Sequence, residues 1–190
     1  MNLFKRIFSN KEGGIHVHDL AVIPLNLMKE KGSPFNDWVP PDIEVPDEMM
    51  QMCNYYTWLY QLFVYYAVAN EVLGYDIAEK IIEIQDESAN DILDSNLFKI
   101  KNSVKKINSA VCKFNESPEI SEEDQEEMPL EFSMAKEFFL SGDYDPFNYK
   151  DQGLVSEHFA VLGLCLVQGK DSALKVFKPQ LQQIAESISA

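Results

Sequence analysis

The stretch Met49–Asn70, "MMQMCNYYTWLYQLFVYYAVAN", contains 22 residues without a charged side chain, and seven of them are aromatic. Its length would suit a membrane span, since roughly 20 apolar residues cross a bilayer as a helix. Its polar side chains, however, are spread through its depth rather than gathered at two interfaces. On a helical wheel Gln51, Asn54, Thr57 and Gln61 share one side. A helix with a polar stripe but no charge indicates a core helix surrounded by protein.

Around this stretch the chain is a succession of helical patterns. Asp47 is a suitable N-cap and Gly74 a suitable terminator, which predicts a first long helix over 47–73. Further helices are predicted at 76–95, 97–115, 129–141, 154–168 and 171–188, with Gly169 separating the last two. The fold class is therefore mainly α, a compact bundle of about five to seven helices.

Residues 1–47 have a different character. "IHVHDLAVIPL" alternates at first and is rich in Val and Ile, which favours a short strand at 15–23. Proline fixes φ and lacks an N–H donor, so the prolines that follow predict an extended arm. Five of the nine prolines fall here: Pro24, Pro34, Pro40, Pro41 and Pro46. We expect 1–47 to form a short helix and an extended arm packed on the body, and 48–190 to form a single α-helical domain.

The first residues carry an amphipathic pattern. The apolar residues Leu3, Phe4, Ile7 and Phe8 share a helical face, and Lys5, Arg6 and Lys11 surround it. The apolar part is too short for a secretory signal. Such a segment either lies on a membrane surface or docks on its own domain as a short helix, and we expect the second.

Charge is the unusual property of the composition. Sixteen basic residues against 31 acidic ones give a formal net charge of −15. Such a surface repels nucleic acid and anionic lipid, so we expect no nucleic-acid partner and no stable membrane insertion. It attracts a basic protein partner, although acidity also serves solubility alone.

Most of the charge runs have an explanation in folding. Residues 76–94 hold seven acids and one lysine, a net of −6, and residues 97–115 hold five lysines and no acid. A short turn joins the two segments, so we expect the lysines to offset repulsion among the acids.

The segment 116–127, here called the acidic segment, is not explained in this way. It contains seven acids and no base: Glu116, Glu119, Glu122, Glu123, Asp124, Glu126 and Glu127. The macrodipole at a helix N-terminus favours two or three carboxylates, not seven. The acidic segment is therefore a candidate for partner binding.

The loop "DYDPFNYKDQG" offers a second candidate surface. Tyr144, Asp145, Phe147 and Tyr149 lie close together in it, and aromatic side chains on loops often dominate the energy of protein–protein binding. The alternative is that the rings fold inward and fill a junction between helices.

No motif points to a metal or a cofactor. On a strand, His16 and His18 would share one face, but a third ligand would have to be Asp19 or the distant His158. This is a weak pattern, so we expect no metal. No phosphate loop, nucleophile elbow or HExxH sequence occurs, and we expect no cofactor and no catalytic residue.

The three cysteines, Cys53, Cys112 and Cys165, are far apart and lie in apolar contexts. They indicate free thiols in a reducing compartment, which favours the cytoplasm.

Together these patterns predict a non-catalytic, cytoplasmic protein-binding module, in its most concrete form an acidic inhibitor of the immunity type that neutralises a basic partner protein. The acidic segment would steer the partner and the aromatic loop would dock it. The alternative is a helical small-ligand-binding protein or enzyme with a tyrosine-lined pocket on helix 49–73. Neither hypothesis favours a particular oligomeric state.

Overall fold

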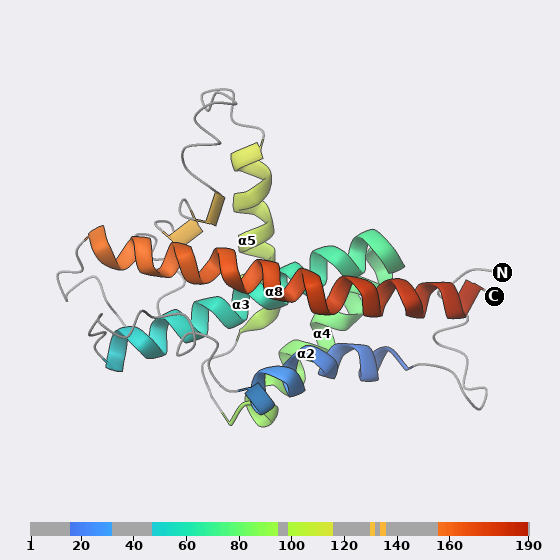
Figure 1. The fold of residues 1–190 in the computed structure, drawn as a ribbon. Coiled ribbons are helices and arrows are strands. Elements are labelled where there is room, and N and C mark those ends of the chain that lie inside the picture. Colours follow the sequence, from blue (N-terminus) through green and yellow to red (C-terminus); the bar gives the residue numbers. More distant parts are fainter. Residues whose placement is uncertain are drawn as a thin grey trace. The chain divides into compact units, whose positions relative to one another are not determined.

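A computed structural model of the protein describes residues 16–31, 47–94, 99–115, 130–131, 134–135 and 156–189, with side chains at 16–30, 53–94, 99–112, 130, 131, 134, 135 and 162–186. Five helices occupy these stretches: α2 (Val17–Lys31), α3 (Asp47–Leu73), α4 (Tyr75–Ile92), α5 (Ile100–Asn115) and α8 (Ser156–Ser189) (Figure 1). No strand occurs in them, so the prediction of a mainly α fold is confirmed. Residues 32–46 of the proline-rich arm lie outside the described residues, whereas Pro24 lies inside α2 and not in an extended segment.

The chain divides into two compact units. Unit 1 contains Met1–Gly32, Leu62–Asn102 and Asp171–Ala190, and unit 2 contains Ser33–Gln61 and Ser103–Lys170. Helices α3, α5 and α8 therefore each contribute residues to both units. The expected division into 1–47 and 48–190 stays a prediction, because much of the first segment lies outside the described residues.

Helix α3 is buried on nearly all sides. From Cys53 to Leu73 only Ala67, Asn70 and Glu71 are exposed. In unit 2 two members of its polar stripe face α8: Thr57 is fully buried, with its Cγ2 3.0 Å from the position of a Cβ at Gly169, and the Gln61 side-chain amide donates to the Gly169 carbonyl at 3.5 Å. The prediction of a core helix is confirmed for these side chains.

The end of α3 is set by a glycine, as predicted. Gly74 has a φ of +93°, a region that side chains with a Cβ rarely adopt. Its N–H donates to the Asn70 carbonyl at 3.1 Å, and α4 begins at the next residue, Tyr75. The backbone conformation of one residue thus separates two helices that would otherwise run on.

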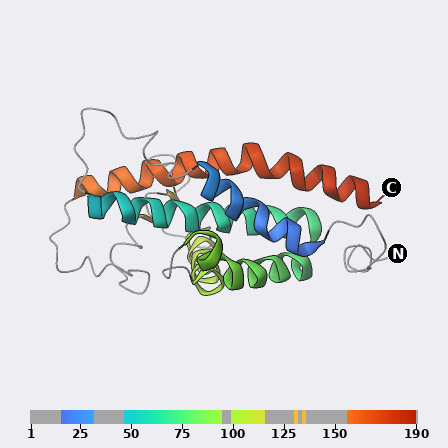
Figure 2. The ribbon, with the colours of Figure 1, turned by 90° about the horizontal axis from the view of Figure 1, so that it is seen from below.

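Unit 1 is built on the packing of α2 against α4. Figure 2 shows α2, in blue, between α4 and the C-terminal part of α8. The buried face of α4 consists of Ile77, Ala78, Ile81, Ile82, Gln85 and Ala89. Apolar residues recur there at helical spacing, while the acids of α4 occupy the other positions.

The prediction of a strand at 15–23 is wrong, because residues 17–23 belong to α2. The buried residues of α2 are Val17, Leu20, Ala21, Pro24, Leu25 and Met28, whose spacing of 3, 1, 3, 1 and 3 is that of one helix face. The alternation in "IHVHDL" is too short to compete with this pattern. Tertiary packing on α4 decides the outcome, although Pro24 lies inside the helix.

Two side chains from other helices donate hydrogen bonds to backbone carbonyls in the helical turn before Pro24. A proline inside a helix has no N–H for the carbonyl four residues earlier, which here is Leu20. The Tyr65 hydroxyl of α3 donates to the Leu20 carbonyl at 2.7 Å. The Gln85 side-chain amide of α4 donates to the neighbouring Ala21 carbonyl at 3.1 Å. These contacts offset the cost of a proline in a helix, which is about 3 kcal/mol.

We predict that Tyr65→Phe lowers the free energy of unfolding by about 1–3 kcal/mol, because the buried Leu20 carbonyl then loses a donor from outside its helix. In a Pro24→Ala background, residue 24 supplies an N–H to Leu20, so the same substitution costs less. Urea unfolding of the four proteins of this cycle measures the difference. An equal loss in both backgrounds would contradict the role given to Pro24.

The predicted break at Gly169 is also wrong, since α8 continues from Ser156 to Ser189. The reason for the glycine is close packing rather than helix termination. A Cβ at residue 169 would lie 3.0 Å from Cγ2 of Thr57, tighter than an ordinary van der Waals contact. The small residue therefore lets α8 approach α3 closely in unit 2.

We predict that Gly169→Ala destabilises the protein by about 1 kcal/mol. Overpacking against Thr57, which is stiff at χ1, costs roughly 1–3 kcal/mol and exceeds the gain in helix propensity of about 1 kcal/mol. In a Thr57→Ser background the methyl group is gone, and Gly169→Ala should become stabilising. Thermal unfolding of the four proteins tests this, and a loss of the same size in both backgrounds would exclude the contact as the cause.

Candidate functional site

The residues predicted to bind a partner lie outside the described residues. This holds for the acidic segment, Glu116 to Glu127, and for Tyr144, Asp145, Phe147 and Tyr149 of the aromatic loop. What the structure describes is where the chain enters and leaves the acidic segment. Helix α5 ends at Asn115, directly before it, and helical residues resume at Leu130.

The two histidines do not share a face, contrary to the expectation for a strand. His16 precedes α2, and its carbonyl accepts hydrogen bonds from the N–H groups of Asp19 and Leu20. His18 lies inside the helix, and both side chains are exposed. Among the residues that the structure describes, no group of three or more His, Cys, Asp or Glu side chains is arranged to hold a metal.

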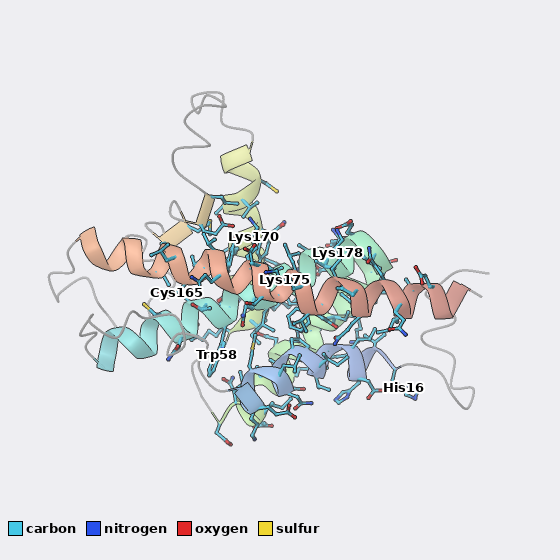
Figure 3. The ribbon with its side chains drawn as sticks, in the orientation of Figure 1. His16, Trp58, Cys165, Lys170, Lys175 and Lys178 are labelled. Atoms are coloured by element: carbon cyan, nitrogen blue, oxygen red, sulfur yellow. The ribbon has the colours of Figure 1, made fainter. Side chains whose placement is uncertain are left out.

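A buried carboxylate stands out in unit 2. Glu131 is 4% exposed, and its Oε1 accepts a hydrogen bond from the Tyr60 hydroxyl at 3.0 Å and one from Lys170 Nζ at 2.6 Å. Tyr60 comes from α3, and Lys170, labelled in Figure 3, comes from α8. We call these three residues the Glu131 anchor. It joins the chain just after the acidic segment to two long helices.

The electrostatics of the Glu131 anchor keep Glu131 ionised. Burial alone would raise the pKa of this carboxyl, but the hydrogen bonds and positive charge from Lys170, with the Tyr60 hydrogen bond, hold it below its usual range. Burial and the neighbouring Glu131 carboxylate raise the pKa of Tyr60. A carboxylate with a lowered pKa is a poor base, and a tyrosine with a raised pKa is a poor acid, so the arrangement suits structural anchoring better than proton transfer.

Two buried cysteines of unit 2 are similarly unreactive. Cys53 of α3 and Cys165 of α8 are buried free thiols, and burial raises the pKa of both, that of Cys165 to about 12. A nucleophilic cysteine needs a lowered pKa. At neutral pH these thiols are protonated and behave as small apolar side chains.

The tyrosine hydroxyls of α3 bond to separate partners. Tyr60 donates to Glu131 in unit 2, while in unit 1 Tyr65 donates to the Leu20 carbonyl and Tyr66 donates to Glu79 Oε1 at 3.0 Å. A tyrosine-lined binding pocket needs hydroxyls that converge on one space. The described contacts of these three hydroxyls do not favour such a pocket, which stays a prediction.

Comparisons of the chain with protein-family models, curated proteins and solved structures find no significant match.

Sequence reasoning missed the Glu131 anchor. Glu131 follows Pro129 at the predicted start of a helix, where an acid is ordinary because it faces the positive end of the macrodipole. The available signal was its setting, "PLEFSMA", in which it is the one charged residue among apolar and small ones. Its partners, 71 residues before it and 39 after it, have no signal in the sequence.

We predict that Lys170→Met lowers the free energy of unfolding by about 2–3 kcal/mol at neutral pH, because it leaves a buried carboxylate without its cation. Glu131→Gln should cost less, since the neutral amide still accepts from Tyr60 and Lys170 is partly open to solvent. Glu71→Gln is the matched control, because Glu71 and Lys178 form an exposed ion pair at 3.2 Å. It should cost at most about 1 kcal/mol.

The pH dependence separates these effects. A lowered pKa in the folded state contributes stability above the usual carboxyl range, and this is lost as the pH falls through that range. In Lys170→Met burial dominates and the pKa of Glu131 lies above its unfolded value, so acid restores stability to the variant. The difference between wild type and Lys170→Met should therefore narrow as the pH falls from 7 to 4, first because protonation of Glu131 relieves the variant and then because wild type loses the stability of its ionised carboxylate. Urea unfolding at pH 7 and pH 4 measures it, and a constant difference would contradict an ionised Glu131.

Proposed function

We propose that the protein is a non-catalytic, cytoplasmic protein-binding module that recognises a basic partner protein, most concretely as an inhibitor of the immunity type. The observation that carries the proposal is the acidic segment, with its seven acids and no base in a chain of net charge −15. A one-signed cluster of this density costs stability through self-repulsion. A partner that brings positive charge to it would relieve that repulsion on binding.

The ion pairs of the described helices support this proposal. Lys101 bonds to Glu83 at 2.9 Å and Lys80 bonds to the same carboxylate at 3.2 Å. The Lys101 N–H also donates to Asp86 at 2.9 Å. The expectation that lysines after residue 97 offset the acids of α4 is thus confirmed at Lys101. Lys80 and Lys101 are therefore already paired with acids of α4. The acidic segment contains no base of its own, so a partner could supply the positive charge that it lacks.

The Glu131 anchor supports the proposal in a second way. It fixes the chain four residues after Glu127, the last acid of the segment, to α3 and α8. On the other side, α5 ends one residue before Glu116. A binding segment held at both ends loses less conformational freedom when a partner binds, which favours affinity.

In the proposed mechanism the two candidate surfaces have different roles. The acidic segment attracts the basic partner over a distance, which allows association rates of about 10⁸–10⁹ M⁻¹s⁻¹ at low salt. Tyr144, Asp145, Phe147 and Tyr149 of the aromatic loop then make the short-range contacts that slow dissociation. No membrane-crossing role enters the proposal, and no helix in the described stretches is both long and apolar enough to span a bilayer.

The test compares two charge-reversal variants with the same change in net charge. The first changes Glu122, Glu123, Glu126 and Glu127 to Lys. The matched control changes four exposed acids of α4 and α8 to Lys: Glu87, Asp91, Asp171 and Glu186. Each tagged protein captures partners from native cells at two salt concentrations, and binding rates are then measured with the basic protein that wild type enriches.

We predict that the acidic-segment variant slows association at least about tenfold and flattens its dependence on salt, whereas the control retains most of the rate. An equal effect of both variants would mean that net charge alone steers binding. If neither variant changed the association rate, the acidic segment would have no role in recognition.

A further inference from the structure

A groove between α2 and α8 in unit 1 presents an apolar stripe with a polar rim. It has a volume of about 420 Å³ and is lined by Ile23, Asn26, Leu27 and Glu30 of α2 and by Gln180, Gln183 and Ile184 of α8. The α2 residues are spaced 3, 1 and 3 apart and the α8 residues 3 and 1, so each helix contributes one continuous stripe. Figure 2 shows the two helices side by side.

The burial of the lining residues indicates what kind of ligand fits. Ile23, Leu27 and Ile184 are half-buried, while Asn26, Glu30, Gln180 and Gln183 are exposed. A small-molecule site encloses most of its ligand, which an open groove between two helices does not do. A groove with an apolar floor and exposed polar edges is instead the form that receives the apolar face of an amphipathic helix.

We propose that the α2–α8 groove is the docking site of this chain's own segment 2–8, "NLFKRIF". Its apolar residues Leu3, Phe4, Ile7 and Phe8 fall on one face of a helix and match the floor of Ile23, Leu27 and Ile184. The segment itself lies outside the described residues, so the inference rests on the groove, on chain length and on charge.

The chain between the segment and the groove is long enough. Seven residues lie between Phe8 and His16, the residue before α2, and the eight steps from Phe8 to His16 span at most about 28 Å when the chain is extended. Ile23 lies seven residues further along α2 and Leu27 eleven, which is about 10 and 16 Å along a helix axis. The segment can therefore fold back along α2, and the short tether gives it an effective concentration in the millimolar range.

Charge favours the same occupant. Glu30 is the single charged residue among the seven that line the groove, and its side chain is exposed. The nearby Lys29 is engaged with Asp94, their side chains being 3.6 Å apart. Lys5 and Arg6 of the segment would therefore approach the Glu30 carboxylate at the groove edge, where a segment carrying acids would be repelled.

The experiment removes residues 2–8 and returns them as a separate probe. A fluorescent peptide of residues 2–14 is added to the truncated protein, to the full chain and to truncated proteins carrying Leu27→Gln or Ile84→Gln. Ile84 is the matched control, because it is half-buried in α4 and does not line the groove. A peptide with Phe4→Glu and Phe8→Glu is the control for the probe. Anisotropy gives the affinity, and circular dichroism shows that each variant is folded.

We expect the peptide to bind the truncated protein and its Ile84→Gln form, to bind the Leu27→Gln form at least about tenfold more weakly, and to bind the full chain hardly at all because the groove is filled. Truncation should lower the melting temperature by roughly 2–8 °C. Equal affinity for the Leu27→Gln and Ile84→Gln forms, or no binding to the truncated protein, would overturn the proposal.

Two other occupants give distinct results, and each would also overturn it. If the groove receives a second copy of the chain, light scattering would show a dimer of the full chain that Leu27→Gln dissociates. If residues 2–8 serve a membrane surface, the full chain would float with liposomes containing anionic lipid, Phe4→Glu with Phe8→Glu would abolish flotation, and the peptide would not bind the groove.

Discussion

A buried backbone carbonyl in α2 depends on a donor from another helix, and the arrangement of unit 1 follows from this requirement. Pro24 has no N–H for Leu20, and an unsatisfied buried carbonyl costs about as much as a lost hydrogen bond. The Tyr65 hydroxyl meets the need from α3, and Gln85 of α4 bonds to the next carbonyl. Because both donors have fixed positions on their helices, they determine where along α3 and α4 the part of α2 around Pro24 can lie. Apolar packing alone would allow α2 to shift by one helical turn along α3 and α4.

The same principle operates in unit 2 with a charge in place of a carbonyl. A buried carboxylate destabilises the folded state unless a cation and further hydrogen-bond donors surround it. Removing only the cation destabilises the protein more than replacing both members of the pair by apolar side chains. Glu131 meets this condition through Tyr60 and Lys170. The pair adds little net stability compared with apolar side chains of the same size, but it admits very few alternative placements of residue 131. Both units thus use a polar group in an apolar core to select one arrangement.

Local sequence patterns predicted the helices well where the structure depends on the local residues alone. The uncharged run Met49–Asn70 predicted a core helix because burial on all sides requires such a composition, and the positive φ at Gly74 accounts for the predicted end. The strand at 15–23 and the break at Gly169 were wrong because contacts distant in sequence overrode the local pattern, namely α4 against α2 and Thr57 against Gly169. For the same reason no reading of the sequence could place Tyr60 and Lys170 on Glu131. The partner-binding residues of the acidic segment and the aromatic loop stay predictions, since composition identifies them and the described residues do not include them.

Gly74 and Gly169 illustrate how one residue type meets two different physical requirements. At Gly169 the demand is for volume, because a Cβ would meet Thr57. At Gly74 nothing lies within 4 Å of the position a Cβ would take, yet φ is +93°. The restriction there is one of handedness, since positive φ penalises L-residues through their own backbone. Mirror-image chemistry would therefore distinguish the two sites: a D-residue suits the backbone at Gly74, and no choice of chirality makes room at Gly169.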